Sequence, residues 1–365
     1  MHISKIHLTN FRNFSSLDLP VDQGLVVISG PNGAGKTNFL EGIYFGTSLR
    51  RFPESHFSQL VKLGEDFFNV NLEIKNGACE RLEVFWQSRP PSSGLLRTSA
   101  DQQKVTRAKY AGEVPVISFL PQDLVLLTRS PQNRRRFLNE ALSAASASYR
   151  EASAQYERAL RQRNSLWATI AMGQAGEADL EIWDEQLAEN GSVVSGGRED
   201  FLARAQETLP EILAALSPTR GLVELKYLRG GASNRDEFRS MLLSARDEER
   251  RVQTTLVGPH RDDFTAEWEG QSVAGFLSRG QIRSLTLALK IFQRQFLEEL
   301  KGRSPILLLD DVFSEFDETH QRTIGAFLET FPQVFLTSAN LEMLRDLIHS
   351  RQTFLVEAGE FKPRS

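Results

Sequence analysis

The residues with the clearest chemical potential form the segment GPNGAGKT, which follows the apolar, β-branched run GLVVISG and precedes a helical pattern. Glycines in such a turn let backbone N–H groups and the start of the helix face a phosphate. The lysine supplies a positive charge, and the threonine hydroxyl is a ligand for Mg²⁺. A chance glycine turn is the alternative. The residues predicted to bind a nucleotide are Gly30, Pro31, Asn32, Gly33, Ala34, Gly35, Lys36 and Thr37.

A second chemical feature is an acidic pair that follows an apolar run. Residues 306–309 predict a buried strand, which would deliver Asp310 and Asp311 to a site at its C-terminal end. Asp310 is predicted to hold Mg²⁺, directly or through water, and Asp311 to act as a general base that orients water on the γ-phosphate. An acidic pair that merely ends a strand is the alternative, and the phosphate loop argues against it.

The third feature is FLSRGQ, which opens an amphipathic stretch over residues 276–300. Ser278, Gly280 and Gln281 lie at or near the start of this predicted helix, where a small hydroxyl residue and a glycine leave N–H groups open to an anion. The same residues could form an ordinary helix cap, and the segment taken alone favours the cap.

The elements around these motifs indicate an α/β protein, because strands alternate with helical patterns in a way that is typical of a parallel sheet. In the first third of the chain, we expect a strand at 24–30, an antiparallel hairpin over 68–86, an exposed basic loop at 88–110, for which a short strand is the alternative, and a buried strand at 114–124. In the middle, we expect a long amphipathic helix from about 131 to 160, helices at 179–190 and 199–216 separated by 193–198, a short strand from 223 and a charged helix at 235–251. The last expected strands lie at 264–268, 306–309, 333–340 and 353–356.

The domain organisation follows from a change in composition. Near residue 124 the chain changes from β-rich to a mixture of Ala, Arg, Glu and Gln, and after residue 254 the strand pattern returns. We therefore expect a head made of residues 1–123 and 255–365, with an inserted, mostly helical lobe at 124–254. A length of 365 residues is consistent with two domains.

Composition excludes several classes of protein. The chain has 43 Lys and Arg against 47 Asp and Glu, a net charge of -4, and 40% apolar residues, values that argue against disorder and against a histone-like protein. No apolar run approaches the roughly 20 residues that span a bilayer. The single Cys79 cannot form an internal disulfide. The sequence therefore predicts a cytoplasmic protein without a membrane partner.

Together, GPNGAGKT, LSRGQ, LLLDD and SEFD resemble the ABC-type ATPase heads, in which two heads enclose two ATP molecules. The long segment between the phosphate loop and LSRGQ resembles the SMC and Rad50 type of head, which carries an inserted arm. NFRNF, YERALRQRN, TLVGPHRDDF and ILLLDDVFSEFD resemble the RecF family of bacterial DNA replication and repair proteins, from end to end and in the order of that family.

The resemblance implies that Lys36, Thr37 and Asp310 bind MgATP, while Ser278 and Gly280, with the neighbouring arginine, reach the γ-phosphate bound by a partner subunit. Hydrolysis would then require an ATP-dependent homodimer.

Two further positions gain a role from the resemblance. Arg12, in NFRNF, is implied to be a neighbour of the phosphates or adenine, although a surface arginine fits equally well. Gln122, in FLPQD, is implied to be a glutamine that senses metal and water, although a plain turn residue fits equally well.

Two positions depart from the wider ABC pattern, and a polar segment follows at residues 260–262. Asp311 stands where most ABC proteins have glutamate, and the shorter side chain predicts slow hydrolysis. Thr337 stands near the switch position, where many transporters have histidine. His260, Arg261 and Asp262 are polar, and a structural ion pair that braces the arm is the favoured interpretation for the charged pair.

DNA contacts are suggested by local positive charge. Residues 129–163 contain eight Arg and three Glu, and the predicted basic loop adds more. With the resemblance, the candidates for sequence-independent, salt-sensitive phosphate contacts are Arg134, Arg135, Arg136, Arg97, Lys104 and Arg107. A solvated helix face is the alternative for the arginine triplet.

The resemblance implies an ATP-dependent protein of recombinational repair and replication-fork maintenance, whose dimer closes on double-stranded DNA near single-strand gaps and helps RecO and RecR to load RecA. Another SMC- or Rad50-like protein, or an ATPase of the overcoming-lysogenization-defect type, is the alternative. The motor subunit of a membrane importer also shares these motifs, but it predicts a short insert, a histidine switch and a transmembrane partner.

Overall fold

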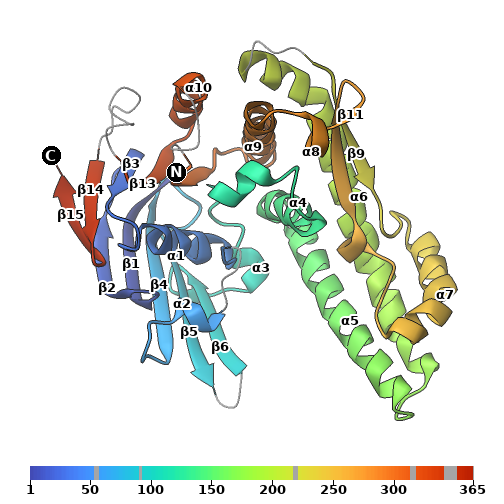
Figure 1. Ribbon diagram of the computed structural model, residues 1–365. Helices are drawn as coiled ribbons and strands as arrows, with labels where there is room; N and C mark the ends of the chain where they lie inside the picture. The colour runs from blue at the N-terminus through green and yellow to red at the C-terminus, as the bar shows by residue number, and fades with distance from the viewer. Residues whose placement is uncertain (53–56, 90–92, 217–220, 313–317, 341–351, 365) are drawn as a thin grey trace. The chain divides into compact units, whose positions relative to one another are not determined.

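The structure is a computed structural model that describes residues 1–52, 57–89, 93–216, 221–312, 318–340 and 352–364 (Figure 1). It divides into two compact units, Met1–Leu124 with Lys290–Ser365, and Val125–Leu289. The second unit therefore includes the strand at 264–268, which pairs with the strand that begins at 223. The predicted division into a head and an arm with a boundary after residue 254 stays a prediction.

The first unit contains a mostly parallel sheet that positions the phosphate loop. Its described strands, in spatial order, are β15 (Glu360–Arg364), β14 (Gln352–Glu357), β3 (Gly24–Ser29), β13 (Gln333–Ser338), β12 (Ile306–Asp310) and β8 (Val116–Phe119). All neighbours are parallel except β14 and β15. The parallel sheet and its five predicted strands are confirmed, while β15 was not expected.

A second sheet in the same unit is antiparallel. Its described strands are β2 (Phe14–Pro20), β1 (His2–Phe11), β4 (Phe67–Lys75), β5 (Arg81–Arg89), β6 (Ser93–Ala100) and β7 (Gln103–Lys104). The predicted hairpin is confirmed as β4 and β5. For the segment at 88–110 the alternative of a short strand is confirmed in place of a continuous loop, because β6 pairs with β5 along its whole length, and α3 (Arg107–Tyr110) follows.

Helix α1 (Lys36–Ser48) lies between the two sheets (Figure 1). Its side chains are buried on almost every face, as expected for a helix with sheet on both sides. Gly42 and Gly46 let it approach the antiparallel sheet closely, since an added Cβ would meet Leu8 or Val70. The helix that begins at the phosphate loop is therefore held along its whole length by the core.

The second unit is built mainly of helices. These are α4 (Pro131–Ala145), α5 (Ala147–Ala171), η2 (Glu177–Leu180), α6 (Glu181–Leu216), α7 (Arg235–Val252), η3 (Pro259–Arg261), α8 (Val273–Phe276) and the start of α9 (Arg279–Lys301), with the small sheet β11 (Gln271–Ser272), β10 (Asp263–Trp268) and β9 (Val223–Leu228). The predicted strand from 223 and the charged helix at 235–251 are confirmed.

Two helix predictions for this unit are wrong. The expected long helix from 131 breaks at Ser146, whose extended backbone caps α5 and whose hydroxyl accepts a hydrogen bond from the N–H of Tyr149. The two helices expected at 179–190 and 199–216 form the single helix α6. Gly191 lies against Phe238, and Gly197 lies against Tyr149, so these glycines provide room for neighbouring rings and do not end the helix.

A buried ion-pair cluster joins the long helices of this unit. Arg163 on α5 is fully buried, and its guanidinium lies 2.7 Å from carboxylate oxygens of both Asp184 on α6 and Glu249 on α7. Arg246 makes a second contact with Asp184, at 2.7 Å. Because a buried charge is costly without a partner, the cluster fixes how these helices pack.

None of the helices in the described ranges is long and apolar enough to cross a membrane.

Candidate nucleotide-binding site

The register of the parallel sheet places the predicted site residues at one edge. Ser29, the last residue before the phosphate loop, is paired with Ser338, and Asp310 is paired with Thr337. Phe119, which is paired with Leu309, ends the strand before Gln122. Because the carboxyl ends of parallel strands meet at the same edge, the phosphate loop, the acidic pair and the loop after β8 lie together there.

The phosphate loop has the backbone that the motif requires. Gly35 has φ of 109°, and an added Cβ would lie 2.5 Å from the side-chain amide of Asn13. Gly30 lies against the carbonyl oxygen of Val356, which also excludes a side chain. Lys36 is buried and donates hydrogen bonds to the carbonyl oxygens of Gly30 at 2.7 Å and Pro31 at 3.0 Å. Its ammonium group is thus folded over the loop, where phosphate oxygens could replace those carbonyls.

Thr37 and Asp310 supply adjacent oxygen atoms at the end of the sheet. The Thr37 hydroxyl lies 3.0 and 2.9 Å from the two carboxylate oxygens of Asp310, and the Thr337 hydroxyl donates to the same carboxylate at 2.7 Å. Burial raises the pKa of Asp310, and the neighbouring Asp311 adds to that effect. A cation beside this carboxylate would offset the cost of burying its charge.

These oxygens fit Mg²⁺ held jointly with phosphates. Mg²⁺ commonly takes one or two protein oxygens together with substrate phosphates and water. No group of three or more His, Cys, Asp or Glu side chains within metal-binding reach occurs among the described residues. With one hydroxyl and one carboxylate side by side, the Thr37–Asp310 pair suits a metal that arrives with a nucleotide.

Asp311 follows directly and turns the chain away from β12. It has φ of 45°, in the left-handed region that aspartate tolerates better than most residues. Its N–H lies 3.1 Å from both the carbonyl and the hydroxyl oxygen of Thr337. Thr337 therefore holds both members of the acidic pair, a positioning role that the sequence analysis missed. SEFD, residues 314–317, lies outside the described residues.

Gln122 is half-buried in η1 (Pro121–Val125), immediately after β8. The next residue, Asp123, is buried, and its carboxylate lies 3.1 Å from the ammonium of Lys290. Lys290 also donates to the carbonyl oxygen of Ser118 at 2.7 Å. The loop that carries Gln122 is therefore anchored by its neighbour, which the sequence analysis did not foresee.

Arg12 lies beside the phosphate loop, but its guanidinium is engaged. Its Nε donates to Oε2 of Glu41 on α1 at 2.7 Å, and a terminal nitrogen lies 2.5 Å from the same oxygen. The next residue, Asn13, accepts a hydrogen bond from Asn38 at 2.8 Å. The structure thus brings the NFRNF turn to the loop, with Arg12 bound to Glu41.

The LSRGQ residues lie at the start of α9, in the second unit. The Ser278 hydroxyl accepts from the N–H of Gln281 at 3.3 Å, and the Gln281 side chain accepts from the N–H of Ser278 at 3.0 Å. This reciprocal pair is a capping box. Gly280 lies in the first turn. The helix cap considered from the sequence is thus present, and any contact with ATP stays a prediction.

The arginine triplet at 134–136 has protein partners, and its contact with DNA stays a prediction. Arg134 is buried and makes two hydrogen bonds, of 2.6 and 2.8 Å, to the carboxylate of Asp263. Arg135 donates to the carbonyl of Asp262 at 2.8 Å, and Arg136 lies 3.4 Å from Glu140. The partner of Arg134 gives that residue a structural role that could not be seen from the sequence, whereas Arg135 and Arg136 are half-buried.

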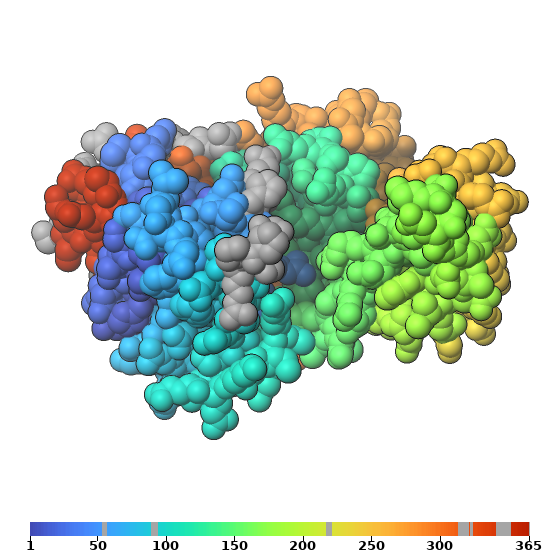
Figure 2. All heavy atoms as spheres, turned by 90° about the horizontal axis from the view of Figure 1, so that it is seen from below, coloured from blue at the N-terminus to red at the C-terminus, as the bar shows by residue number. Residues whose placement is uncertain are grey.

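The other basic candidates are exposed. Arg97 on β6, Lys104 on β7 and Arg107 on α3 all have exposed side chains at the edge of the antiparallel sheet. The segment that carries them, coloured cyan, forms part of the surface of the first unit in Figure 2. Their contact with DNA stays a prediction.

The polar segment at residues 260–262 belongs to the core of the second unit. Asp262 is fully buried and lies 2.8 Å from the guanidinium of Arg198 on α6. The sequence did not predict Arg198 as its partner, and a brace formed by Arg261 and Asp262 between the arm and the head stays a prediction. His260 bonds the Tyr156 hydroxyl through Nδ1 at 2.6 Å and the Thr255 carbonyl through Nε2 at 2.9 Å. Burial lowers the pKa of His260 to about 4, which keeps the ring neutral.

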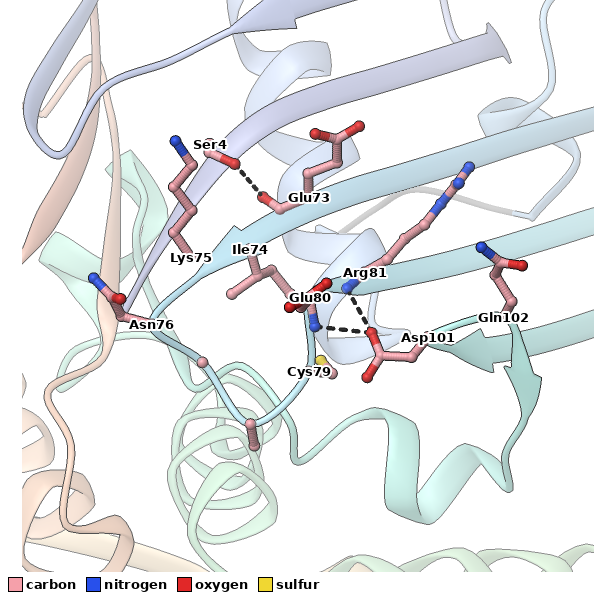
Figure 3. Close-up of a pocket in the computed structure, with 12 residues that line it drawn as sticks. Ser4, Glu73, Ile74, Lys75, Asn76, Cys79, Glu80, Arg81, Asp101 and Gln102 are labelled. Carbon is pink, nitrogen blue, oxygen red and sulfur yellow. Dashed lines mark hydrogen bonds between the residues drawn. The ribbon is translucent and has the colours of Figure 1, made fainter.

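A pocket of about 1070 Å³ lies at the turn between β4 and β5 (Figure 3). Ser4, near the start of β1, lines it, whereas the NFRNF turn follows the other end of the same strand. Burial raises the pKa of Cys79, which also lines the pocket, to about 11, so the thiol stays protonated at neutral pH. This pocket is distinct from the edge that carries the phosphate loop.

Comparison with known proteins identifies the family. The family model described as RecF/RecN/SMC N terminal domain matches residues 2–361. The DNA replication and repair protein RecF of Moorella thermoacetica is 36% identical over 346 residues, which cover 94% of this chain and 91% of that protein. The chain belongs to the RecF family. Its relative from Geotalea uraniireducens is 31% identical over 99% of both chains.

Solved structures agree with the family assignment. The recombination mediator protein RecF with ATP is 28% identical, with a TM-score of 0.87 over 100% of this chain and 97% of the other. A Smc head bound to the C-winged helix domain of ScpA, 15% identical with a TM-score of 0.55, supports the fold alone. The predicted ABC-type ATPase head and the resemblance to the RecF family are therefore confirmed.

Proposed function

We propose that this protein is an ATP-dependent DNA-binding protein of recombinational repair and replication-fork maintenance that hydrolyses ATP slowly. The observation that carries the proposal is the Thr37 hydroxyl at 3.0 and 2.9 Å from the carboxylate oxygens of Asp310, at the edge where the phosphate loop emerges. At that edge the phosphate-loop motif, the strand that precedes it and the oxygens suited to a metal all indicate binding of a nucleotide with Mg²⁺. The RecF structure solved with ATP, at 28% identity, supports the same ligand.

Each residue of this edge receives a role from its geometry. The loop N–H groups and Lys36 bind phosphate oxygens, and Thr37 and Asp310 hold the metal. MgATP, when bound, supplies the phosphoryl group and the metal that neutralises its charge. Asp311 orients the attacking water, and its side chain is one methylene shorter than that of glutamate, so we expect slow turnover. Gln122, from the loop after β8, is proposed to sense metal and water.

The start of α9 is proposed to act on a second subunit. Ser278, Gly280 and Gln281 present a helix N-terminus, which favours an anion. We propose that two copies dimerise when ATP is bound, each copy offering this helix start to the γ-phosphate of the other. Hydrolysis then opens the dimer.

For the nucleic acid, we propose double-stranded DNA near single-strand gaps. Arg97, Lys104 and Arg107 are exposed and suit phosphate contacts that do not depend on sequence. RecO and RecR are proposed as partners in loading RecA, and the cytoplasm as the location. The RecF relatives, described as DNA replication and repair proteins, support this assignment.

The first experiment removes the phosphate-loop charge. Lys36→Met should abolish ATP binding and ATP-dependent retention on gapped duplex DNA together, whereas Lys75→Met, an exposed lysine in β4, should change neither. ATP binding is measured by equilibrium titration, and DNA retention is measured with and without ATP. Unchanged ATP-dependent retention in Lys36→Met would disprove the link between nucleotide and DNA.

The second experiment measures molecular mass in solution with no nucleotide, with ADP and with ATP, each with and without short gapped DNA. The wild type should dimerise with ATP, while Ser278→Arg should remain a monomer because the longer side chain fills the helix start. A mass that never responds to ATP, in a protein that still binds DNA, would reject the proposed role of the LSRGQ residues.

A further inference from the structure

Glu41 is a buried carboxylate within the core helix that starts at the phosphate loop. It lies one helical turn after Thr37, and only 2% of its surface is exposed. A charge in such a place is costly unless strong hydrogen bonds compensate for the lost water. The partners of Glu41 therefore indicate what the charge is for.

Those partners come from segments on either side of α1. Oε2 lies 2.7 Å from Nε and 2.5 Å from a terminal nitrogen of Arg12, and Oε1 accepts from the N–H of Phe52 at 3.1 Å. Arg12 lies in the tight turn between β1 and β2, with φ of 55°, and its own N–H donates to the carbonyl of Leu60 at 2.7 Å. Both the side chain and the backbone of Arg12 are thus fixed.

Fixing Arg12 also fixes the next residue against the phosphate loop. The Asn13 amide lies 2.5 Å from the position that a Cβ on Gly35 would occupy, and its oxygen accepts from Asn38 at 2.8 Å. Gly35 directly precedes Lys36. A displacement of this turn would therefore be transmitted to the N–H groups that face a phosphate.

We propose that Glu41 is a positioning residue for the nucleotide: it holds Arg12, and through Arg12 the Asn13 amide, so that the turn between β1 and β2 shapes the phosphate loop. Arg12 then acts through Glu41 and Asn13 and is not a phosphate ligand. If its guanidinium moved to a phosphate, Glu41 would lose a charged partner in a buried site. This inference rests on the proposed binding of ATP.

The test compares ATP and ADP affinity in excess Mg²⁺, by equilibrium titration well below the melting temperature, in Glu41→Gln, Arg12→Ala and the double variant. Glutamine keeps an acceptor for Phe52 and removes the charge. We expect each single variant to weaken ATP and ADP by the same factor, about tenfold, as for other residues that orient a binding group. The double variant should lose no more than Arg12→Ala alone, because both changes break one contact.

Asp18→Asn is the matched control. Asp18 lies in β2 of the same hairpin and pairs with Lys5 at 3.0 Å, away from the turn. The ATP and ADP affinities of Asp18→Asn should therefore equal those of the wild type. Thermal melting without nucleotide measures any loss of stability separately from affinity. If Glu41→Gln does not fold, Arg12→Ala still separates a positioning residue from a γ-phosphate ligand, because only a γ-phosphate ligand predicts a change in the ratio of ATP to ADP affinity.

Three results would overturn part of the reasoning. Arg12→Ala that weakens nucleotide binding while Glu41→Gln is unchanged or tighter would make Arg12 a direct ligand, of the γ-phosphate if only ATP is weakened and of the rest of the nucleotide if ATP and ADP are weakened alike. Normal affinity in all Glu41 and Arg12 variants would leave the ion pair a purely structural contact. A wild type that binds neither nucleotide would reject the proposed function, and the inference with it.

Discussion

Replacing Arg134 should weaken folding of the second unit without removing a DNA contact. Arg134 would be a natural target for a DNA-binding screen, because it begins the triplet at 134–136. In the structure its side chain is only 10% exposed, and it binds the carboxylate of Asp263, itself 17% exposed, at 2.6 and 2.8 Å. Arg134→Met would leave that carboxylate without its charged partner.

The magnitude follows from what remains around Asp263. Breaking one side of a buried ion pair costs about 3–5 kcal/mol in the free energy of unfolding. Asp263 would keep the hydrogen bond from the N–H of Phe264, at 2.8 Å, and some contact with water. We therefore expect a loss near the lower end, about 3 kcal/mol. Arg134→Met with Asp263→Asn should recover most of it, because the unpaired charge is then absent.

The assay combines denaturant unfolding with DNA binding over a series of salt concentrations. Each lost phosphate contact reduces the slope of log K against log salt by about 0.9 for duplex DNA. Arg134→Met should leave the slope unchanged at a temperature where it is folded, whereas Arg107→Ala, which changes an exposed arginine, should reduce the slope at unchanged stability. A reduced slope with normal stability in Arg134→Met would refute the structural assignment.

Three further predictions concern individual site and core residues. Burial raises the pKa of Asp310, so the folded protein binds a proton at this carboxyl more readily than the unfolded chain does, and stability falls as the pH rises and the carboxyl ionises. Asparagine cannot ionise, so Asp310→Asn should raise the melting temperature measured without nucleotide. The same variant should abolish Mg²⁺-dependent ATP binding. The pKa of His260 is about 4 in the folded protein and 6.5 in the unfolded chain, so the free energy of unfolding should fall by up to about 3 kcal/mol as the pH drops from 6.5 to 4. Denaturant titrations of His260→Gln should show a free energy of unfolding that lacks this part of the pH dependence. Gly35→Ala should abolish ATP binding in equilibrium titration, because φ of 109° and the Asn13 amide at 2.5 Å exclude a methyl group; ordinary affinity would show that the loop can rearrange.

The part of the site that could be predicted is the part encoded over short distances. The phosphate loop joins a strand to a helix within a few residues, and its glycines, lysine and threonine carry their chemistry with them. To place the acidic pair, it was enough to predict that the apolar run before it is a parallel strand, because parallel strands end at the edge of the sheet that carries the phosphate loop. These two predictions needed no knowledge of distant partners.

The remaining features depend on residues far apart in the chain. Glu41 looks like an ordinary helix residue until Arg12, 29 positions away, is placed beside it. Thr337 gains its role only from Asp310, 27 positions away. Gly191, within what the sequence divided into two helices, is explained by the ring of Phe238. The role of each of these residues follows from tertiary packing, which overrides local propensity.

The capping box at the start of α9 is compatible with an anion-binding role for the same residues. The cap uses the hydroxyl and N–H of Ser278 and the N–H and side-chain oxygen of Gln281. Arg279 and Gly280 lie between them in the first turn, where backbone N–H groups have no acceptor within the helix. The cap therefore fixes the start of α9 and leaves the N–H groups of Arg279 and Gly280 available to a phosphate. Ser278 and Gln281 would then act by shaping the turn, and Gly280 by letting the phosphate approach its backbone.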